Sequence, residues 1–227
     1  FPYTTLFRSV VHVLPRSGRI NAFMIDEQGK GLRALGGDFV NSAAAPSKSV
    51  VIAAIPNQKS KKGSKNTAAA HVLRLLAPGD VDANVTAEVI SADGVFIPVG
   101  LNSRTVSAGI VTEIDFSPNI SATAFALRIT SNEPVIASVQ STVISNGRKD
   151  FTWSTASPEL APLTLAVTGL TPVIIFAGAE INVALDVTLI NGKVIREQIK
   201  GSDLAVWRAP TTARSFTITK VGGSTYA

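Results

Sequence analysis

Short runs in which apolar and polar residues alternate are clearest between Ala70 and Val99. The runs cover residues 71–77, 84–90 and 95–99. A two-residue period is typical of a β-strand with one buried face. Pro-Gly-Asp separates the first two runs and Asp93-Gly94 the last two, and Asp-Gly accepts the positive φ that hairpin turns require. The pattern therefore predicts three strands that form an antiparallel β-meander.

The same pattern extends over the rest of the chain. Strands are predicted at residues 10–13, 19–25 and 49–55, with a turn at residues 26–31. Between residues 48 and 160, turn-forming residues separate short apolar runs, which predicts about eight strands. No ten-residue window shows a sustained helical period, so the sequence predicts an all-β fold with very little helix.

An internal repeat divides these strands into modules. Residues 38–46 recur without gaps at residues 150–158, sharing Asp, Phe, Ser, Ala and Pro. Further on, residues 84–89 resemble 182–187, and residues 125–129 resemble 216–220. The matches keep their order, and their spacing of about 100–115 residues is that of a β-sandwich module. The sequence thus predicts tandem antiparallel, immunoglobulin-like β-sandwich modules.

The repeat also predicts the module boundaries. Residues 10–47 are interpreted as the C-terminal remnant of one module, 48–160 as a complete module and 161–227 as a truncated one. Residues 1–9 read like a translated sequencing adapter, and we expect them to be an artefact. The chain is therefore expected to be a fragment, incomplete at both ends.

Composition and charge exclude several classes of protein. Hydrophobic residues make up 45% and charged residues 16% of the chain, which favours a packed core over disorder. There is no cysteine, so disulfides and cysteine metal sites are excluded. The net charge of +5 is concentrated in the loop 57–67, which carries Lys59, Lys61, Lys62 and Lys65. Without these lysines and Arg8, 16 basic residues face 16 acidic residues, which argues against nucleic-acid binding.

The lysine-rich loop is one of two speculative binding sites. It could attract an anionic envelope polymer or lipid headgroups, or it could be a solvated loop without a ligand. The second candidate is Trp153, which could stack on a sugar ring or pack in the core, as could Trp207. Trp153 occupies the position of Asn41 in the repeat, so the fold itself does not require an aromatic residue there.

No motif predicts a metal, a cofactor or catalysis. Asp80, Asp82 and Asn84 have the alternating oxygen ligands that begin a calcium loop. That loop also needs Gly at its sixth and Glu at its twelfth position, where this chain has Val85 and Ser91. The two histidines are far apart, and neither Gly-x-Ser-x-Gly nor Ser-x-x-Lys occurs. The sequence therefore predicts a protein that is not an enzyme.

Several motifs resemble a known family. They are Gly36-Gly37-Asp38-Phe39, the runs at residues 43–46, 75–83 and 94–101, Thr105 to Gly109, and Thr130 to Val135. Together they are similar to an actinobacterial family of envelope-associated proteins, described as large secreted proteins of unknown function. The resemblance implies an extracytoplasmic location, in the envelope or secreted, and a membrane anchor that this fragment lacks. It implies no activity.

These observations lead to two expected functions. The first is a non-enzymatic structural or protein-interaction module of the bacterial cell envelope, whose partner is an unidentified envelope protein or glycan. The alternative is a carbohydrate-binding β-sandwich module that acts on envelope glycans through Trp153.

Overall fold

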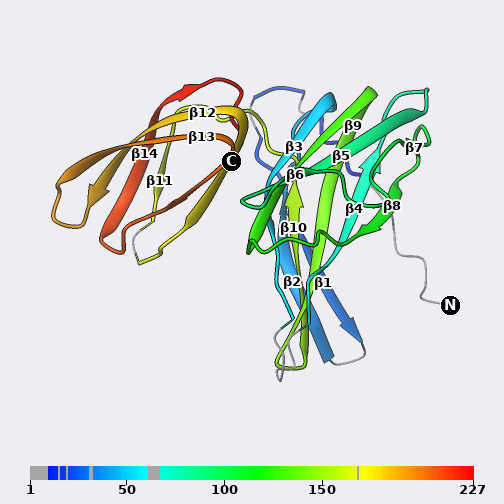
Figure 1. Ribbon diagram of the computed structural model, residues 1–227, viewed down its shortest axis with the longest axis horizontal. Helices are drawn as coiled ribbons and strands as arrows, with labels where there is room; N and C mark the ends of the chain where they lie inside the picture. The colour runs from blue at the N-terminus through cyan, green and yellow to red at the C-terminus, as the bar shows by residue number, and fades with distance from the viewer. Residues whose placement is uncertain (1–9, 15, 19, 31–32, 61–66, 168) are drawn as a thin grey trace.

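The computed structural model describes residues 10–227 except residues 15, 19, 31–32, 61–66 and 168. Within this part of the chain every regular element is a β-strand, and every pair of strands is antiparallel. The strands form sheets of two, eight and four strands (Figure 1). The predicted all-β fold is confirmed. No described segment is a helix that could cross a membrane.

The eight-stranded sheet contains β3 (Ser47–Pro56), β4 (Ala70–Leu76), β5 (Ala83–Ser91), β6 (Gly94–Phe96), β7 (Arg104–Val106), β8 (Thr112–Phe116), β9 (Ala124–Ser145) and β10 (Arg148–Thr155). Its longest strand, β9, has 22 residues and pairs with four others. The first half of β9 pairs with β3 and β5, and the second half pairs with β4 and β10. One strand thus belongs to two groups of strands.

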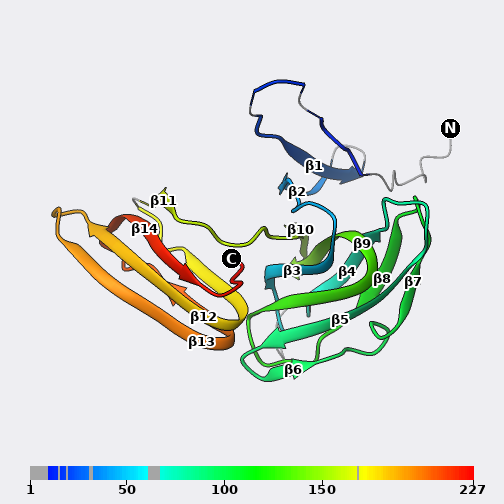
Figure 2. The same ribbon diagram turned by 90° about the horizontal axis from the view of Figure 1, so that it is seen from above.

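A single hydrophobic cluster joins the two groups. In β4, His71, Leu73 and Leu75 are buried while the residues between them are half-buried, and β5 alternates in the same way from Ala83 to Val89. The cluster combines Leu73 and Leu75 with Ile52, Val89 and Leu127 from the other group. The two groups therefore form two layers around one core, with β9 continuous between them (Figure 2).

The four-stranded sheet has its own core. It contains β11 (Leu163–Ala166), β12 (Val173–Leu189), β13 (Val194–Arg208) and β14 (Ala213–Gly222), in the order β11-β14-β12-β13. Trp207 and Phe216 pack at a centroid distance of 5.1 Å within a cluster that includes Phe176 and Leu185. The Trp207 indole N–H donates to Glu197 Oε2 at 2.6 Å, which satisfies the polar atom of a buried ring.

The two-stranded sheet is a hairpin of β1 (Phe23–Lys30) and β2 (Arg33–Asn41). Asp26 lies opposite Asp38 in the register, and Ile25 lies opposite Phe39. These two pairs point to opposite faces of the hairpin, because successive side chains of a strand alternate. The Asp face packs against β10, whereas Phe39 is 62% exposed on the other face.

Three local predictions were wrong. Residues 10–13 are not a strand, and the turn predicted at residues 26–31 is strand as far as Lys30. Of the predicted meander only the β5–β6 hairpin across Asp93-Gly94 forms, because β4 pairs with β8 and β9 and not with β5. Alternation shows that a strand has one buried face but does not identify its hydrogen-bonded neighbour.

His71 is a buried titratable group in the central core. Its side chain is 2% exposed, and its ring lies 5.4 Å from Phe116 and 5.2 Å from Phe125, centroid to centroid. Nδ1 lies 2.9 Å from Ser141 Oγ, and Nε2 has no hydrogen-bond partner within the described residues. Burial lowers the pKa of His71 to about 4, so the folded protein holds this ring neutral.

Acid should therefore destabilise the fold through His71. An unfolded histidine titrates near pH ~6.5, so the stability that depends on the neutral ring is complete above that pH. It is lost as the pH falls towards the folded-state value of about 4. Relative to a His71→Leu variant, the wild-type free energy of unfolding should fall by about 2.5 kcal/mol between pH 7.5 and 4.5, measured by urea denaturation.

The exposed His12 provides the matched control. A His12→Gln variant should retain the wild-type pH dependence. If wild type and His71→Leu lose stability equally on acidification, the buried ring is not the source of the effect.

Candidate functional site

Two junctions connect the central eight-stranded sheet to the other two sheets (Figure 2). At the N-terminal junction, the hairpin β1–β2 packs against β10. At the C-terminal junction, β12, β13 and the segment after β14 pack against β3, β5 and β9. At each junction, polar or charged side chains link parts of the chain that are far apart in sequence.

Asp38 is the central residue of the N-terminal junction. Its Oδ2 accepts hydrogen bonds from the backbone N–H of Trp153 at 2.6 Å and from Thr152 Oγ1 at 2.9 Å. Among the named strands, β10 pairs only with β9, so its backbone groups on the other side need partners. Asp38 supplies one of these partners, which protects the edge of the central sheet.

Trp153 is held in this junction by its ring as well as its backbone. Its indole Nε1–H donates to Asp26 Oδ2 at 2.9 Å, and the guanidinium carbon of Arg74 lies 4.5 Å from its ring centroid. Arg74 Nε in turn donates to Glu113 Oε1 at 2.7 Å. The ring of this predicted binding residue is half-buried, with its N–H bonded and one face next to Arg74.

Gly36 allows the hairpin to approach β10 closely. Its φ is +137°, and a Cβ at this position would lie 2.5 Å from Asp150 Oδ1 and 3.1 Å from Phe151 Cδ1. Only glycine fits both the backbone conformation and the space. The Gly-Gly-Asp-Phe motif that begins at Gly36 thus places Asp38 against the edge of β10.

The C-terminal junction is mainly apolar. Val51, Ala53, Ile90 and Ala126 of the central sheet form a cluster with Ala177, Leu204 and Tyr226. β3 is buried on consecutive residues because Val50 and Ile52 face the core while Val51 and Ala53 face this junction. Tyr226 exchanges backbone hydrogen bonds of 2.8 and 2.9 Å with Ala177, which ties the end of the described chain to β12.

Arg128 adds a charged link at the same junction. Its Nη2 lies 2.8 Å from Glu88 Oε2 in the neighbouring strand, and its Nη1 lies 3.9 Å from Asp203 Oδ1 in β13. These side chains are 31–44% exposed, so water screens them and the expected stabilisation is small. Of the two pairs, only the one between Arg128 and Asp203 connects β13 to the central sheet.

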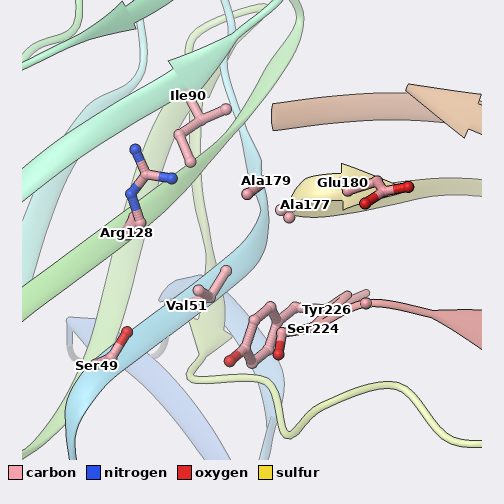
Figure 3. Close-up of a pocket in the computed structure, with 11 residues that line it drawn as sticks. Ser49, Val51, Ile90, Arg128, Ala177, Ala179, Glu180, Ser224 and Tyr226 are labelled. Carbon is pink, nitrogen blue, oxygen red and sulfur yellow. The ribbon is translucent and has the colours of Figure 1, made fainter. Parts of the chain in front are cut away.

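A cleft of about 450 Å³ opens beside this link (Figure 3). Val51, Ile90 and Arg128 line it from the central sheet, and Ala177, Glu180 and Tyr226 line it from the other side. Burial, with the charge of Glu159 and a hydrogen bond to it, raises the pKa of the Tyr226 hydroxyl. Among the described residues no group of three or more His, Asp or Glu side chains could hold a metal ion.

The structure does not bring the predicted binding residues into one site. Trp153 lies in the N-terminal junction, and Lys59 is exposed in the connection after β3. Lys61, Lys62 and Lys65 lie outside the described residues. Sequence reasoning missed Asp26, Asp38, Arg74, Arg128 and Asp203. Two features of the sequence could have indicated the junctions. They are the Gly-Gly pair before Asp38 and the four consecutive apolar residues from Val50 to Ala53.

Fold and junctions together define an all-β protein of three antiparallel sheets, in which the central sheet packs against each of the other two. Residues 7–197 match the model of DUF5719, a family of unknown function, and the chain belongs to this family. The predicted membership in a family of unknown function is thereby confirmed. No curated protein and no solved structure matches the chain.

The role of Asp38 can be tested by removing its carboxylate. An Asp38→Ala variant leaves Trp153 N–H and Thr152 Oγ1 without their acceptor, which costs about 1–3 kcal/mol per unsatisfied group. Hydrogen exchange of the β1–β2 and β10 amides should accelerate about tenfold or more, measured by mass spectrometry. Asp115 is an exposed acid on β8, so Asp115→Ala should leave the same amides unchanged. Equal exchange in both variants would show that Asp38 does not hold the junction.

Proposed function

We propose that the chain is a non-enzymatic structural or protein-interaction part of the cell envelope, made of tandem immunoglobulin-like β-sandwich units and located outside the cytoplasm. The actinobacterial origin implied by the motif resemblance belongs to this proposal. It rests on the order of the strands, on the two junctions and on the exposed apolar residues of the loops.

The strand order supports tandem units. In the central sheet β9 pairs with both β3 and β5, and in the last sheet β14 pairs with both β11 and β12. In each set of three strands, the strand that comes last in the sequence lies between the other two in the sheet. The repeat in the sequence aligns the same members, because residues 125–129 resemble 216–220 and residues 84–89 resemble 182–187.

The observation that carries the proposal is that the central sheet is docked on both sides. Asp38 bonds to β10 at one junction, and an apolar cluster with Arg128 and Asp203 forms the other. Contacts of this kind restrict the motion of neighbouring units, whereas a flexible linker would leave them independent. A row of docked units holds its loops at fixed separations, which suits a scaffold.

Exposed apolar residues on neighbouring loops favour a protein partner. Val81 follows β4 and is 61% exposed, and Ile110 precedes β8 and is 62% exposed. Their loops lie together, because Ala108 N–H donates to Asp82 Oδ1 at 2.9 Å and Gly109 N–H donates to Ala77 O at 2.9 Å. Apolar side chains on adjacent loops of a rigid sheet are typical of interaction surfaces.

The proposal predicts that these loops contact an envelope protein. A photo-crosslinking residue at Val81 or Ile110 should capture a specific protein from an envelope extract of the source bacterium. The same residue at the exposed Thr211, in the connection after β13, should not. The double substitution Val81→Asp and Ile110→Asp should abolish capture without lowering the thermal stability, because both side chains are exposed. Absence of specific capture at both loop positions would count against the proposal.

The glycan alternative makes the opposite prediction for Trp153. Its indole N–H and one ring face already have partners, so we expect no binding to a glycan array. Binding by the wild-type chain that is lost in Trp153→Ala would overturn the proposed function, because Ala removes the ring that could stack on a sugar. Binding that survives the substitution would place a glycan site elsewhere.

A further inference from the structure

Basic residues of two separate connections come together at one end of the molecule, and a third connection lies beside them. The first is the connection after β3, which contains Lys59, and the second is the β9–β10 hairpin, which contains Arg148 and Lys149. Lys149 lies directly opposite Ile144 in the register. The carbonyl of Ile144 accepts hydrogen bonds from Gln58 Nε2 at 3.2 Å and from Thr67 N–H at 3.0 Å. Lys59 and Lys149 therefore flank the same residue.

The third connection joins β1 to β2. Gly36 lies against Asp150, and Asp38 bonds to Thr152 and Trp153, so β2 and β10 run side by side in the same direction. The start of β2 at Arg33, with Lys30 opposite it in the register, consequently lies at the same end as the start of β10. Figure 1 shows β1, β2 and β10 extending together below the rest of the sheets.

The basic side chains that the structure describes at this end are available to a partner. Lys59, Arg148 and Lys149 are exposed, and none of them makes an ion pair within 4.0 Å in the described part of the chain. Gln58 and Thr67, which are both tied to Ile144, bracket a stretch that the sequence makes lysine-rich and free of acids.

The acids nearest to these residues have other hydrogen-bond partners or lie along a strand. Asp150 Oδ1 accepts the backbone N–H of Phe151 at 2.9 Å. Hydrogen bonds from the Ser121 hydroxyl and backbone N–H lower the pKa of Asp93, and the charge of nearby Lys59 adds the smallest contribution. Glu27 lies three residues before Lys30 on β1. The end as a whole has more basic than acidic residues.

We propose that this basic end, defined by Lys59, Arg148 and Lys149, docks on an anionic lipid surface. These residues lie at the end where β1, β2 and β10 extend together below the rest of the sheets, an arrangement that suits a plane. A single-stranded nucleic acid is usually held in a groove with stacking aromatics, and the cleft of this structure lies at the other junction. The proposal rests on this end alone and is independent of the proposed function.

The test is sedimentation with lipid vesicles at low ionic strength. The chain should bind vesicles that contain about one third phosphatidylglycerol in phosphatidylcholine and should not bind phosphatidylcholine alone. The triple substitution Lys59→Gln, Arg148→Gln and Lys149→Gln should weaken partitioning about 100-fold, at roughly one kcal/mol per basic residue near an anionic surface. High salt should abolish binding, because exposed charges are screened.

A matched variant separates this end from net charge. Lys193, Lys200 and Lys220 are exposed on the last sheet, and their replacement by Gln removes the same total charge. This control should bind vesicles within a few-fold of wild type. Equal losses in both triple variants would overturn the proposal, as would binding to uncharged vesicles. Preferential binding of soluble polyphosphate over vesicles of equal phosphate content would also overturn it, by identifying a polymer as the partner.

Discussion

The structure depends on the hydrogen bonding of one strand in two layers. β9 pairs along both edges in its first half and again in its second half, with different neighbours each time. A buried backbone group without a partner is costly, so this double pairing fixes which strands stand beside one another. The hydrophobic core then lies between the layers because Leu127 and Val139, from the two halves of the same strand, face the same interior.

Each junction is formed by a strand that pairs with β9, and β9 therefore connects the two junctions. β10 and β3 pair with β9 and carry the N-terminal and C-terminal junctions respectively. The first junction is directional, because Asp38 and Asp26 accept from particular N–H and O–H groups of β10. The second is apolar, and burial of Val51, Ile90 and Ala126 has no preferred direction beyond shape. Hydrogen bonds therefore set orientation at one side, and hydrophobic contact provides most of the attraction at the other.

The sequence was sufficient for the class of fold and for most strands, and insufficient for their partners. Alternation identified β4 and β5 because each has one buried face. It could not separate them into different layers, since the hydrogen-bonded neighbour of a strand leaves no periodic signal. Asp26 and Gln28 looked like turn residues by composition, yet Asp26 lies within β1 and accepts the indole N–H of Trp153. A contact between residues this far apart in the chain overrides local preference.

The motif Gly36-Gly37-Asp38-Phe39 is explained by the same junction. Gly36 permits close approach to β10, and Asp38, two residues later on the same face of the strand, reaches the edge N–H of Trp153. The repeat replaces Gly36 by Arg148 while keeping Asp150 and Phe151, so the second copy keeps the strand but not the glycine that allows close approach. Arg148 instead lies at the exposed start of β10. The two copies of one sequence pattern therefore differ in role: the first packs against a neighbouring strand, and the second provides the strand that is covered.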